Sequence, residues 1–588
     1  MTAKKEEFSK KRLWGAALSF DFGGKKFQLI DLFVFLGICA LIYGILSVGH
    51  SWVGSSRASM KVDLSPWALP RYTFYSMVRG LAAYLLSLAF TVWYGYVAAK
   101  NKTAERFMVP LLDILQSIPV LGFMPGAVIV LVSLFPDSNI GLELAAILLI
   151  FTGQVWNMTF SFYYSVRYLP ASFNEVAGIY RFSKWQRFKW IELPYSAISL
   201  IWNSIMSMAG GWFFLMICET FVLGSQDYRL PGVGSYMSVA VAEGNIPAMV
   251  YAVLAMLLMI VLLDQFLWRP VVVWSNKFRL EESAGAREEG SFFLDWLKDS
   301  SLLSLAGAWL RESAGRIRKG WRSLFPGSDV FLKNKSKLIT GTWLKWVLLA
   351  GMGAGFLSGA WRFLVMVSSL PFSGWKVIVS GAALTLGRVL ITIVLGSLWT
   401  IPVGLKIGLS ERLSRIFQPV IQILASFPAP MLYPMVISGL VFAHVGLNWG
   451  SIILMVMGTQ WYLLFNVIAG ATAIPHELKE ATRTFNISGS QRWREFYLPA
   501  IFPYLVTGFI TAAGGAWNAS IVAEYVVFRG ERFSAAGIGS LISFAAERAD
   551  FPQLAACLLV MAAVVVAFNR LVWKPLHRFS SERFSLVS

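Results

Sequence analysis

Long apolar segments alternate with shorter polar segments along nearly the whole chain. Each apolar segment approaches the roughly 20 residues that a helix needs to cross a bilayer. In the first half of the chain these segments cover 30–48, 75–98, 119–135, 140–162, 196–223 and 248–273. In the second half they cover 343–364, 384–405, 428–445, 449–471, 500–528 and 554–572. Because helices satisfy their own backbone polar groups in lipid, the pattern predicts an all-α membrane protein with about 12 transmembrane helices.

Positively charged residues in the polar segments predict the orientation of the chain. Lys100 and Lys102 follow the second span, and the loop after the fourth span carries Arg181 and further Lys and Arg residues. The matching loops of the second half are basic too, whereas the alternate loops 49–66 and 224–246 carry few such residues. Cytoplasmic loops hold the excess of Lys and Arg, so both termini are expected in the cytoplasm. With six spans each, the two halves have the same orientation and form parallel repeats.

The composition agrees with a membrane protein and argues against other classes. The 588 residues are 56% hydrophobic and only 14% charged, whereas globular domains are usually nearer to a quarter charged. The net charge of +19 could indicate a nucleic-acid partner, but the Lys and Arg residues lie between apolar segments and report orientation instead. Cys39, Cys218 and Cys557 lie inside apolar segments, which predicts packing side chains and neither a disulfide framework nor a metal site.

Residues 153–247 recur without gaps as residues 458–552, 305 positions later. The matched pairs are Trp156 and Trp461, Pro170 and Pro475, Glu175 and Glu480, Ser183 and Ser488, Trp212 and Trp517, and Glu219 and Glu524. Gly232-Val-Gly-Ser235 matches Gly537-Ile-Gly-Ser540 in the same way. We therefore expect two copies of one membrane unit, 29–276 and 343–588, and such proteins usually have a site between the halves.

Two polar segments lie outside the repeated units. Residues 1–28 form a Lys-rich cytoplasmic arm, and residues 277–342 join the units on the same side. Phe292, Trp296 and Leu303 of the joining segment belong to a set of apolar residues at helical spacing. This spacing fits an amphipathic helix on the inner leaflet, and the mixed charges fit a partly ordered tether equally well. An amphipathic helix and a partly ordered tether are also the two alternatives for the N-terminal arm, residues 1–28.

The loop after the fourth span carries the most specific motif, and it occurs twice. In the first copy the candidate residues are Glu175, Ala177, Arg181, Ser183, Leu193 and Pro194. In the second copy they are Glu480, Ala481, Asn486, Ser488, Leu498 and Pro499. Ser172-x-x-Glu175 fits a capping box, and proline suits the first turn of the next span, so each loop is expected to be a short cytosolic helical hairpin. The spacing of 19 residues from glutamate to proline in both copies favours a docking surface for two similar partners over a solvated connector.

With these residues the chain resembles the permease subunits of ATP-binding-cassette importers. Their cytosolic loop has a Glu-Ala-Ala sequence, a glycine a few residues later and a terminal Leu-Pro. The second half is similar in particular to the nitrate/sulfonate/taurine permease group. The features shared with that group are Thr385-x-x-Arg388, Leu409-Ser410, Pro419, Phe427-Pro428, Pro434, Ala523-Glu524 and Gly537-Ile-Gly539. The resemblance covers roughly 75–275 and 384–580.

The resemblance implies a function, partners and a location. Such permeases fold as a two-fold helical pore (a type I importer), here with two permease units fused in one chain. An extracytoplasmic substrate-binding protein delivers the substrate, and two ATP-binding cassette ATPase subunits grip the cytosolic loops. The chain would then bind no cofactor and would not be an enzyme, since ATP is used by the partners and the chain has no Gly-x-x-x-x-Gly-Lys-Ser/Thr phosphate loop. The expected location is the bacterial plasma (inner) membrane, and the expected substrate is a small anion such as nitrate, a sulfonate, taurine or bicarbonate.

The loops depart from the family pattern at the glycine. Arg181 stands at that position in the first loop and Asn486 in the second. Asparagine tolerates a left-handed backbone conformation, whereas arginine adopts it at a cost. The first loop is therefore expected to turn differently or to dock more weakly, and the two halves are expected to engage their partners unequally.

Four charged residues occupy matching places in the predicted spans of the two halves. Arg79 and Arg388 lie about one turn inside the second span of each half, and Glu219 and Glu524 lie near the outer ends of the fifth. An arginine at the bilayer centre costs about 2.5–3.5 kcal/mol on insertion scales, so a repeated one needs an explanation. One explanation is an Arg–Glu pair that braces the pore mouth in each half. The alternatives are arginines that reach the outer interface and arginines that attract an anionic substrate.

The fifth span of each half contains a tryptophan after a pair of glycines. Trp212 and Trp517 follow Gly-Gly pairs in the fifth spans, and they either line the pore or, as we favour, pack against a neighbouring helix.

An ion-coupled secondary transporter with twelve spans is the alternative function. It would need a carboxylate or histidine near the midplane, whereas Asp and Glu here lie toward the span ends. The identity of the substrate cannot be derived from these residues.

Overall fold

The computed structural model describes residues 20–22, 25–27, 29–53, 61–117, 119–223, 226–278, 293, 342–485, 487 and 489–584. By its internal contacts the chain divides into two units. One comprises Met1–His50, Gln265–Val273 and Ala284–Val365; the other comprises Ser51–Asp264, Trp274–Ser283 and Met366–Ser588. The first unit contains most of helices α2 (Leu29–Val53) and α16 (Thr342–Ser368). The predicted amphipathic helix of the joining segment lies outside the described residues.

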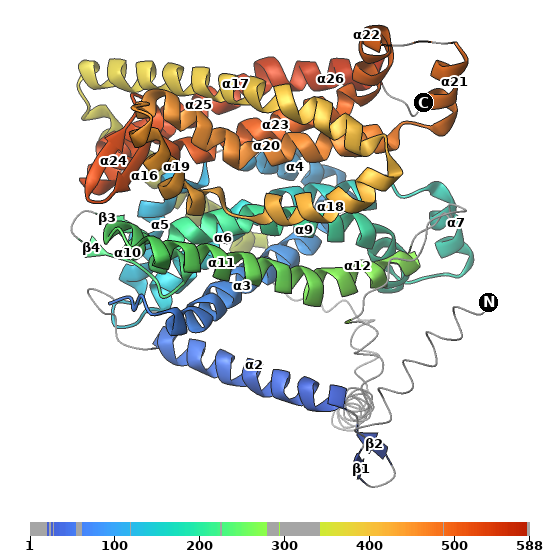
Figure 1. Cartoon of the computed structure of the whole chain (residues 1–588), viewed down its shortest axis with the longest axis horizontal. Coiled ribbons are helices and arrows are strands. Elements are labelled where there is room, and N and C mark those ends of the chain that lie inside the picture. Colours follow the sequence, from blue (N-terminus) through green and yellow to red (C-terminus); the bar gives the residue numbers. More distant parts are fainter. Residues whose placement is uncertain are drawn as a thin grey trace. The chain divides into compact units, whose positions relative to one another are not determined.

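The same order of elements occurs twice, which agrees with the repeat in the sequence. In the first copy the helices are α3 (Leu69–Lys100), α4 (Lys102–Ser117), α5 (Met124–Leu134), α6 (Ile140–Arg167), α7 (Ala171–Ile179), α8 (Lys184–Arg187), α9 (Leu193–Glu219), α10 (Val233–Ala242), α11 (Ile246–Leu263) and α12 (Arg269–Ser275). In the second copy they are α17 (Phe372–Gly408), α18 (Glu411–Ser426), α19 (Tyr433–Phe442), α20 (Leu447–Ala473), α21 (His476–Thr484), α22 (Gly489–Gln491), α23 (Leu498–Ala523), α24 (Ile538–Glu547), α25 (Phe551–Phe568) and α26 (Lys574–Arg583) (Figure 1).

The long helices confirm the predicted membrane class. Among the described residues, eight helices are long and apolar enough to cross a membrane, and two bent pairs raise the number to ten. The eight correspond to the predicted second, fourth, fifth and sixth spans of each half, and α2 and α16 lie at the two predicted first spans. The predicted all-α membrane class is therefore confirmed. The third span of each half differs from the prediction.

Each predicted third span is only the second arm of a sharply bent pair. A 3-10 turn, η2 (Val120–Phe123) or η6 (Ala429–Leu432), leads into α5 or α19, and the helix before it meets this arm at 85° in the first half and 79° in the second. Pro119 and Pro428 stand at the bends. Proline has no N–H to donate, and it disfavours helical geometry in the residue before it, so the helix ends there.

Three antiparallel hairpins accompany the helices among the described residues, and the sequence pattern did not predict them. They are β1 (Phe20–Phe22) with β2 (Lys25–Phe27), β3 (Val222–Leu223) with β4 (Gln226–Asp227), and β5 (Tyr525–Phe528) with β6 (Glu531–Ser534). The second and third follow α9 and α23, so they are equivalent parts of the repeat. In the third hairpin Tyr525 pairs with Ser534 and Phe528 with Glu531.

Within each half, one long helix packs between two others. In the first half α6 packs against α3 and α9, and in the second half α20 packs against α17 and α23. Gly95 of α3 and Gly404 of α17 lie at these contacts: an added Cβ would come within 2.8 Å of the Phe162 ring and within 2.7 Å of Val467. Small residues allow membrane helices to approach closely, which is how these positions serve the packing.

The bent pairs connect the two halves. The first-half segments α4 and η2 pack against α25 and α23, and the second-half segments α18 and η6 pack against α11 and α9. The Val120 N–H donates to Oδ1 of Asn518 at 2.9 Å, and Nε2 of Gln422 donates to Oδ1 of Asp264 at 2.9 Å. The contact between halves therefore follows an approximate two-fold pattern.

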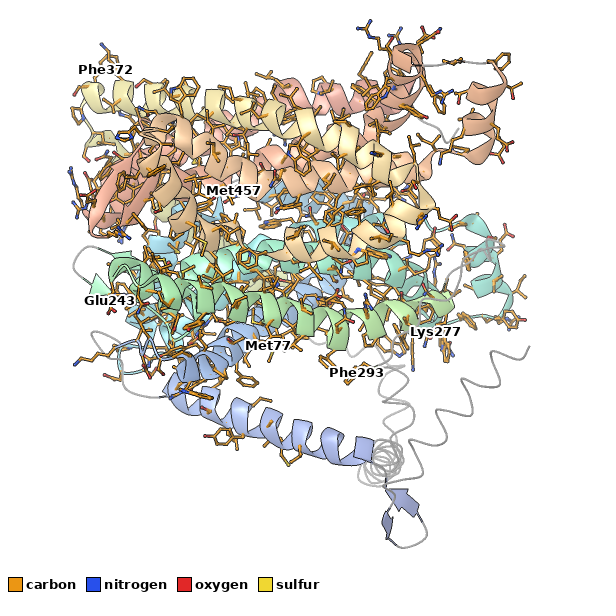
Figure 2. The ribbon with its side chains drawn as sticks, viewed as in Figure 1. Met77, Glu243, Lys277, Phe293, Phe372 and Met457 are labelled. Atoms are coloured by element: carbon orange, nitrogen blue, oxygen red, sulfur yellow. The ribbon has the colours of Figure 1, made fainter. Side chains whose placement is uncertain are left out.

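The two kinds of repeated feature lie at opposite ends of the long helices. Helices α7 and α21 lie at one end, and α10, α24 and the hairpins that precede them lie at the other (Figure 1). The labelled side chains agree, since Glu243 and Phe372 lie at the hairpin end and Lys277 at the other (Figure 2). Both predicted loops are thus on the same side of the bundle.

A matched pair of glycine substitutions tests the packing of α6. A Cβ at Gly141 would lie 2.3 Å from the Leu131 carbonyl oxygen, whereas a Cβ at Gly126 would meet nothing within 4 Å. We expect Gly141→Ala to lower the stability by about 1–3 kcal/mol, because backbone must move. We expect Gly126→Ala to raise it by about 0.5–1 kcal/mol, as for a glycine inside a helix. Thermal unfolding in detergent measures both, and equal effects of the two substitutions would contradict the packing described.

Candidate functional site

The first loop is a compact helical hairpin with a small core of its own. Buried Leu169, Ala177 and Ile191 pack together with Phe173, Phe182 and Tyr195. Arg187 donates a hydrogen bond to Asn174 across the hairpin. The loop continues through a π-helical turn, η3 (Phe188–Glu192), into α9. The Ala177 side chain is thus the anchor of α7 in this core.

The helix starts of this loop differ in part from the prediction. Helix α7 begins at Ala171, close to the expected start, but its N-cap is Pro170 and no side chain caps it. The capping box is instead at α8: the Gln186 N–H donates to Oγ of Ser183, and the Ser183 N–H donates to Oε1 of Gln186. The expected Ser172 capping box is therefore wrong, and Ser183 has the capping role. Leu193 and Pro194 form the first turn of α9, as predicted.

Arg181 occupies the position where related loops have glycine, and its backbone is left-handed, with φ of 50°. The Phe182 N–H donates to the Ala177 carbonyl at 2.9 Å, and the Arg181 N–H donates to the Gly178 carbonyl at 3.1 Å. This is the Schellman arrangement, which ends helices with a left-handed residue. The first loop therefore makes the turn that a glycine would make, at the steric cost of a Cβ, and the expectation that it turns differently is wrong.

The second loop follows the same plan as far as it is described. Helix α21 is followed by α22 and a π-helical turn, η7 (Arg492–Tyr497), and Leu498-Pro499 begin α23. The Ile487 N–H donates to the Thr482 carbonyl at 3.1 Å, in the register of Phe182 and Ala177. Thr482 is buried, as Ala177 is, whereas the predicted Ala481 is half-buried. Asn486 and Ser488 lie outside the described residues.

Both loops present apolar side chains on the outside of their hairpins. Glu175, Arg181 and Ser183 of the first loop and Glu480 of the second are exposed. The large exposed apolar residues beside them are Val176, Ile179, Tyr180, Trp185 and Trp190 in the first loop and Leu478 and Phe485 in the second. Exposed apolar patches with polar rims are typical of protein interaction sites. The loops therefore have the surface of docking elements.

At the opposite end, the first half contains a fully buried arginine held by two carboxylates. Arg79 of α3 contacts Glu143 of α6 through two bonds, with Nε to Oε2 at 2.6 Å and Nη2 to Oε1 at 2.8 Å. Its Nη1 also pairs with Glu219 at the end of α9. The exposed fractions of the three side chains are 1%, 2% and 0%. Ser76 donates to Glu219 at 2.7 Å and completes the cluster, which we call the first clamp.

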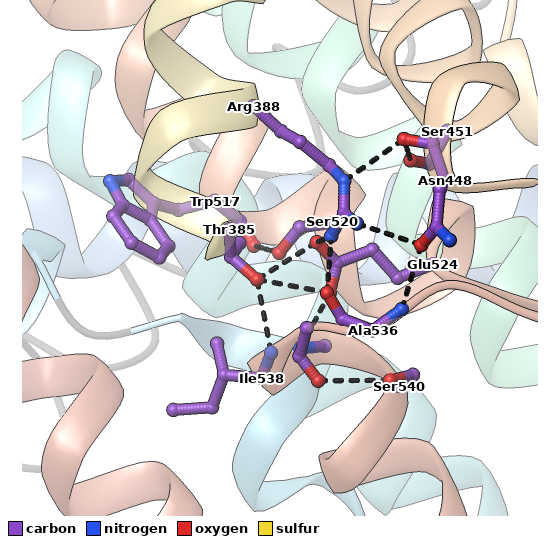
Figure 3. A network of polar contacts seen from close by, with 12 residues as sticks. Thr385, Arg388, Asn448, Ser451, Trp517, Ser520, Glu524, Ala536, Ile538 and Ser540 are labelled. Carbon is purple, nitrogen blue, oxygen red and sulfur yellow. Dashed lines mark hydrogen bonds and ion pairs between the residues drawn. The ribbon is translucent and has the colours of Figure 1, made fainter. Parts of the chain in front are cut away.

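The second half repeats this cluster with one change of charge. Nη1 of Arg388 lies 2.8 Å from Oε1 of Glu524, and Thr385 donates to the same oxygen at 2.8 Å. Arg388 also donates to the backbone carbonyl and side-chain oxygen of Asn448, both at 3.1 Å (Figure 3). Asn448 stands 305 positions after Glu143, so an amide replaces the second carboxylate. We call this cluster the second clamp.

The clamps explain the repeated Gly-x-Gly sequence. The Gly234 N–H donates to Glu219 at 2.8 Å, and the Gly539 N–H donates to Glu524 at 2.9 Å. A Cβ at Gly232 or Gly537 would lie 2.2 Å from the carboxylate of its clamp. Glycine is needed where backbone approaches a side chain this closely. The start of α10 or α24 is therefore held against the end of α9 or α23.

The structure pairs Arg79 with Glu219 and Arg388 with Glu524, and each clamp contains one further polar residue, Glu143 or Asn448, that the sequence analysis did not select. Arg79 and Arg388 are buried within helix packing, which disfavours their reaching the outer interface. Glu143 and Asn448 were missed because each stands in the first turn of its span, where a polar residue usually marks only the helix end. Their equal position in the two repeats was the available signal.

The two tryptophans are in helix packing. Trp212 and Trp517 are 3% and 2% exposed. A Cβ at Gly80 of α3 would lie 2.7 Å from the Trp212 ring, so the indole lies directly on that glycine. The indole of Trp517 points away from the second clamp (Figure 3). Both placements fit the packing role better than a lining of the pore.

The hairpins beside the clamps carry their own ion pairs. Burial of Asp227 opposes its ionisation, but hydrogen bonds from the side chain and N–H of Arg229 hold the pKa of the carboxyl below its usual range. In the longer hairpin, burial and the hydrogen bond to Glu547 raise the pKa of Tyr525 to about 12. Arg532 pairs with Glu547 as well. At the hairpin end of the second half, Glu547 thus bonds to both Tyr525 and Arg532.

A small cavity lies between the halves. Its volume is about 20 Å³, room for about one water molecule. It is lined by α9 of the first half and by α18 and α20 of the second, through Ile205, Met206, Ala209, Gln422, Ala425, Ser426, Gly458, Trp461, Tyr462 and Phe465. Its lining is mostly apolar, with Gln422 and Ser426 as polar groups. The halves are therefore closely packed at this level.

Duplicated membrane units with paired loops at one end define a membrane transport component. The chain belongs to the family described as the binding-protein-dependent transport system inner membrane component, which matches residues 91–267 and again residues 392–572. The two matches together cover more than half of the chain and fall on the two repeats. The predicted resemblance and the fusion of two units are confirmed.

Two curated relatives show what the chain is similar to. The nitrate import permease protein NrtB of Synechococcus elongatus is 29% identical over 164 residues, which are 27% of this chain and 57% of that protein. The bicarbonate transport system permease protein CmpB of Synechococcus elongatus is 27% identical over 173 residues, which are 29% of this chain and 59% of that protein. The chain spans less than two thirds of the length of either relative.

Substitutions in the first clamp have unequal expected costs. Arg79→Gln leaves two buried carboxylates without a cation and should lower the stability by about 3–5 kcal/mol. Glu143→Gln leaves Arg79 paired with Glu219 and keeps an oxygen that accepts a hydrogen bond, as Asn448 does in the second clamp, so about 1–3 kcal/mol is expected. Thermal unfolding of each variant in detergent measures the difference. If the two substitutions cost the same, the shared guanidinium does not hold the clamp together.

Proposed function

We propose that this chain supplies both permease units of an ATP-driven, binding-protein-dependent importer. Two ATP-binding cassette ATPase subunits dock on the two cytosolic loops, and a substrate-binding protein docks at the hairpin end. The observation that carries the proposal is the pair of equivalent loops, both at one end of the bundle and both with exposed apolar side chains. A chain with two such loops offers one site to each of two ATPase subunits.

The chain's own role is passage of the substrate, and ATP is bound and hydrolysed by the partners. Substrate specificity is assigned to small anions such as nitrate, bicarbonate or sulfonates, which rests on the names of the relatives. The clamps brace the outer ends of the pore helices; because each guanidinium is buried and paired, contact with a passing anion has less support. The basic residues that follow the second and fourth spans support a cytoplasmic location of the loops and of both termini.

The alternative of an ion-coupled secondary transporter has less support. Such a protein needs an ionisable group near the membrane midplane that binds the coupling ion. The buried carboxylates described here lie near helix ends, where arginine or lysine pairs with them. The family of the chain also points to a binding protein.

Charge reversal in the loops tests the docking of ATPase subunits. We expect Glu175→Lys or Glu480→Lys to reduce roughly by half the ATPase subunits that copurify from the native membrane, because one of two separate sites remains. The double variant should retain none. Native mass spectrometry and ATP hydrolysis by the purified complex measure both effects.

Glu243→Lys is the matched control, because Glu243 is exposed at the opposite end of the bundle. It should retain both ATPase subunits. Full ATPase content in the double loop variant, or uptake without ATP, would refute the proposed function.

A further inference from the structure

The two halves connect their loops to the long helices by different chemistry. In the first half, Glu192 is the last residue of η3, directly before α9, and its side chain is 0% exposed. Its Oε1 lies 2.5 Å from Nζ of Lys100 and 2.8 Å from Nε of Arg187. Lys100 is the last residue of α3, and Arg187 belongs to the loop. One buried carboxylate therefore joins the loop to the long helix whose other end carries Arg79.

The contact continues into the docking helix of the loop. Arg187, besides its bond to Glu192, donates to the Asn174 side chain of α7. The Lys100 ammonium also lies over the Tyr96 ring, 5.9 Å from its centre, which adds a cation–π contact on α3. A continuous polar path, Asn174–Arg187–Glu192–Lys100, thus runs from α7 to α3. We call it the first-half strap.

The second half has an apolar contact at the same place. Tyr497 stands 305 positions after Glu192, and Leu409 stands 309 positions after Lys100, the spacing that also separates Arg388 from Arg79. Both residues pack against the apolar cluster that contains buried Leu405, Ile501 and Leu505. Among the described residues, the second loop is therefore joined to α17 by apolar packing at the place where the first half has the ionic path.

The second loop has an arginine at the position of Arg187, but this arginine, Arg492, bonds to a different partner. It stands 305 positions after Arg187, and its Nε donates to the Ile487 carbonyl at 2.7 Å. The arginine is kept in both loops, but its partner in the second half is loop backbone. The bond described for Arg492 therefore stays within the loop and does not lead to the long helix.

We propose that Glu192 is the positioning residue through which the first loop moves α3 when the ATPase subunits act. The Glu192 side chain is fully buried, whereas Lys100 and Arg187 are 31% and 34% exposed, so separating the carboxylate from these cations leaves a buried negative charge without compensation. Loop and helix therefore move together in the first half. In the second half, apolar packing takes the place of the ion pair and holds the loop against the helix. The role presupposes the proposed function, because the ATPase subunits supply the movement.

A distance measurement in the assembled complex tests this role. Spin labels at Trp67→Cys and Phe372→Cys, both exposed near the outer ends of α3 and α17, report movement on trapping with ATP and vanadate. Cys39→Ser removes the exposed native cysteine. Glu192→Gln should lower the population that reaches the trapped distance by on the order of tenfold, a typical coupling effect. Binding of the ATPase subunits should be unchanged, since Glu192 is not on the docking surface.

Two further variants separate transmission from folding. Lys100→Leu with Glu192→Tyr installs the residues of the second half, and it should restore the trapped distance by apolar packing. Glu582→Gln removes a carboxylate from an exposed pair with Arg578 and should have no effect. If Glu192 mattered only for folding, Glu192→Gln would lower the yield of assembled complex and leave the trapped distance of the assembled fraction unchanged.

The possible results distinguish the proposed role of Glu192 from the proposed importer function on which it rests. If Glu192→Gln reaches the trapped distance as the unmodified complex does, or if the double variant fails as Glu192→Gln does, Glu192 is not the transmitting contact. If ATPase subunits bind and drive the movement in every variant, the proposed function stands and only the strap is refuted. If the unmodified chain binds no ATPase subunit, both proposals fall.

Discussion

A buried guanidinium that must find carboxylate partners is the constraint on which each half of this protein depends. In each clamp the arginine of the second span bonds to the fourth span and to the glutamate at the end of the fifth, and that glutamate in turn accepts an N–H from the start of the short helix α10 or α24. An unpaired charge at this depth would cost far more than the few kcal/mol by which proteins are stable. The clamps therefore fix the hairpin end of both bundles, and the loops at the other end are left to interact with partners.

The same framework supports different chemistry in its two copies. The first clamp has a second carboxylate where the second clamp has Asn448, and the first loop has an ionic strap where the second has packing around Tyr497. These differences leave the order of the helices unchanged, because each substituted group still fills its site and still meets a partner. Unequal halves are therefore compatible with a common fold, and each loop contacts its long helix through different side chains.

The spans, the duplication and one Arg–Glu pair could be predicted from the sequence, whereas two amphipathic helices and a helix cap could not. Long apolar segments and a gapless repeat fixed the spans and the duplication, and Arg79 with Glu219 could be paired because both break an apolar segment. Helices α4 and α18 mix polar and apolar residues, so neither segment was predicted as a membrane span. In the structure both helices pack against helices of the other half. The Ser172 motif resembled a cap, but the helix begins one residue earlier, and Ser183 has the capping role.

The central claim is that both loops face the cytosol and the hairpins face outside, and labelling of single cysteines tests it most directly. In a cysteine-free background, Tyr180→Cys and Phe485→Cys place one thiol at an exposed site on each loop, and Glu243→Cys and Glu531→Cys do so at the hairpin end. In right-side-out membrane vesicles, a membrane-impermeant maleimide should label positions 243 and 531 at once and positions 180 and 485 only after permeabilisation. Labelling of either loop position in intact vesicles would contradict the account.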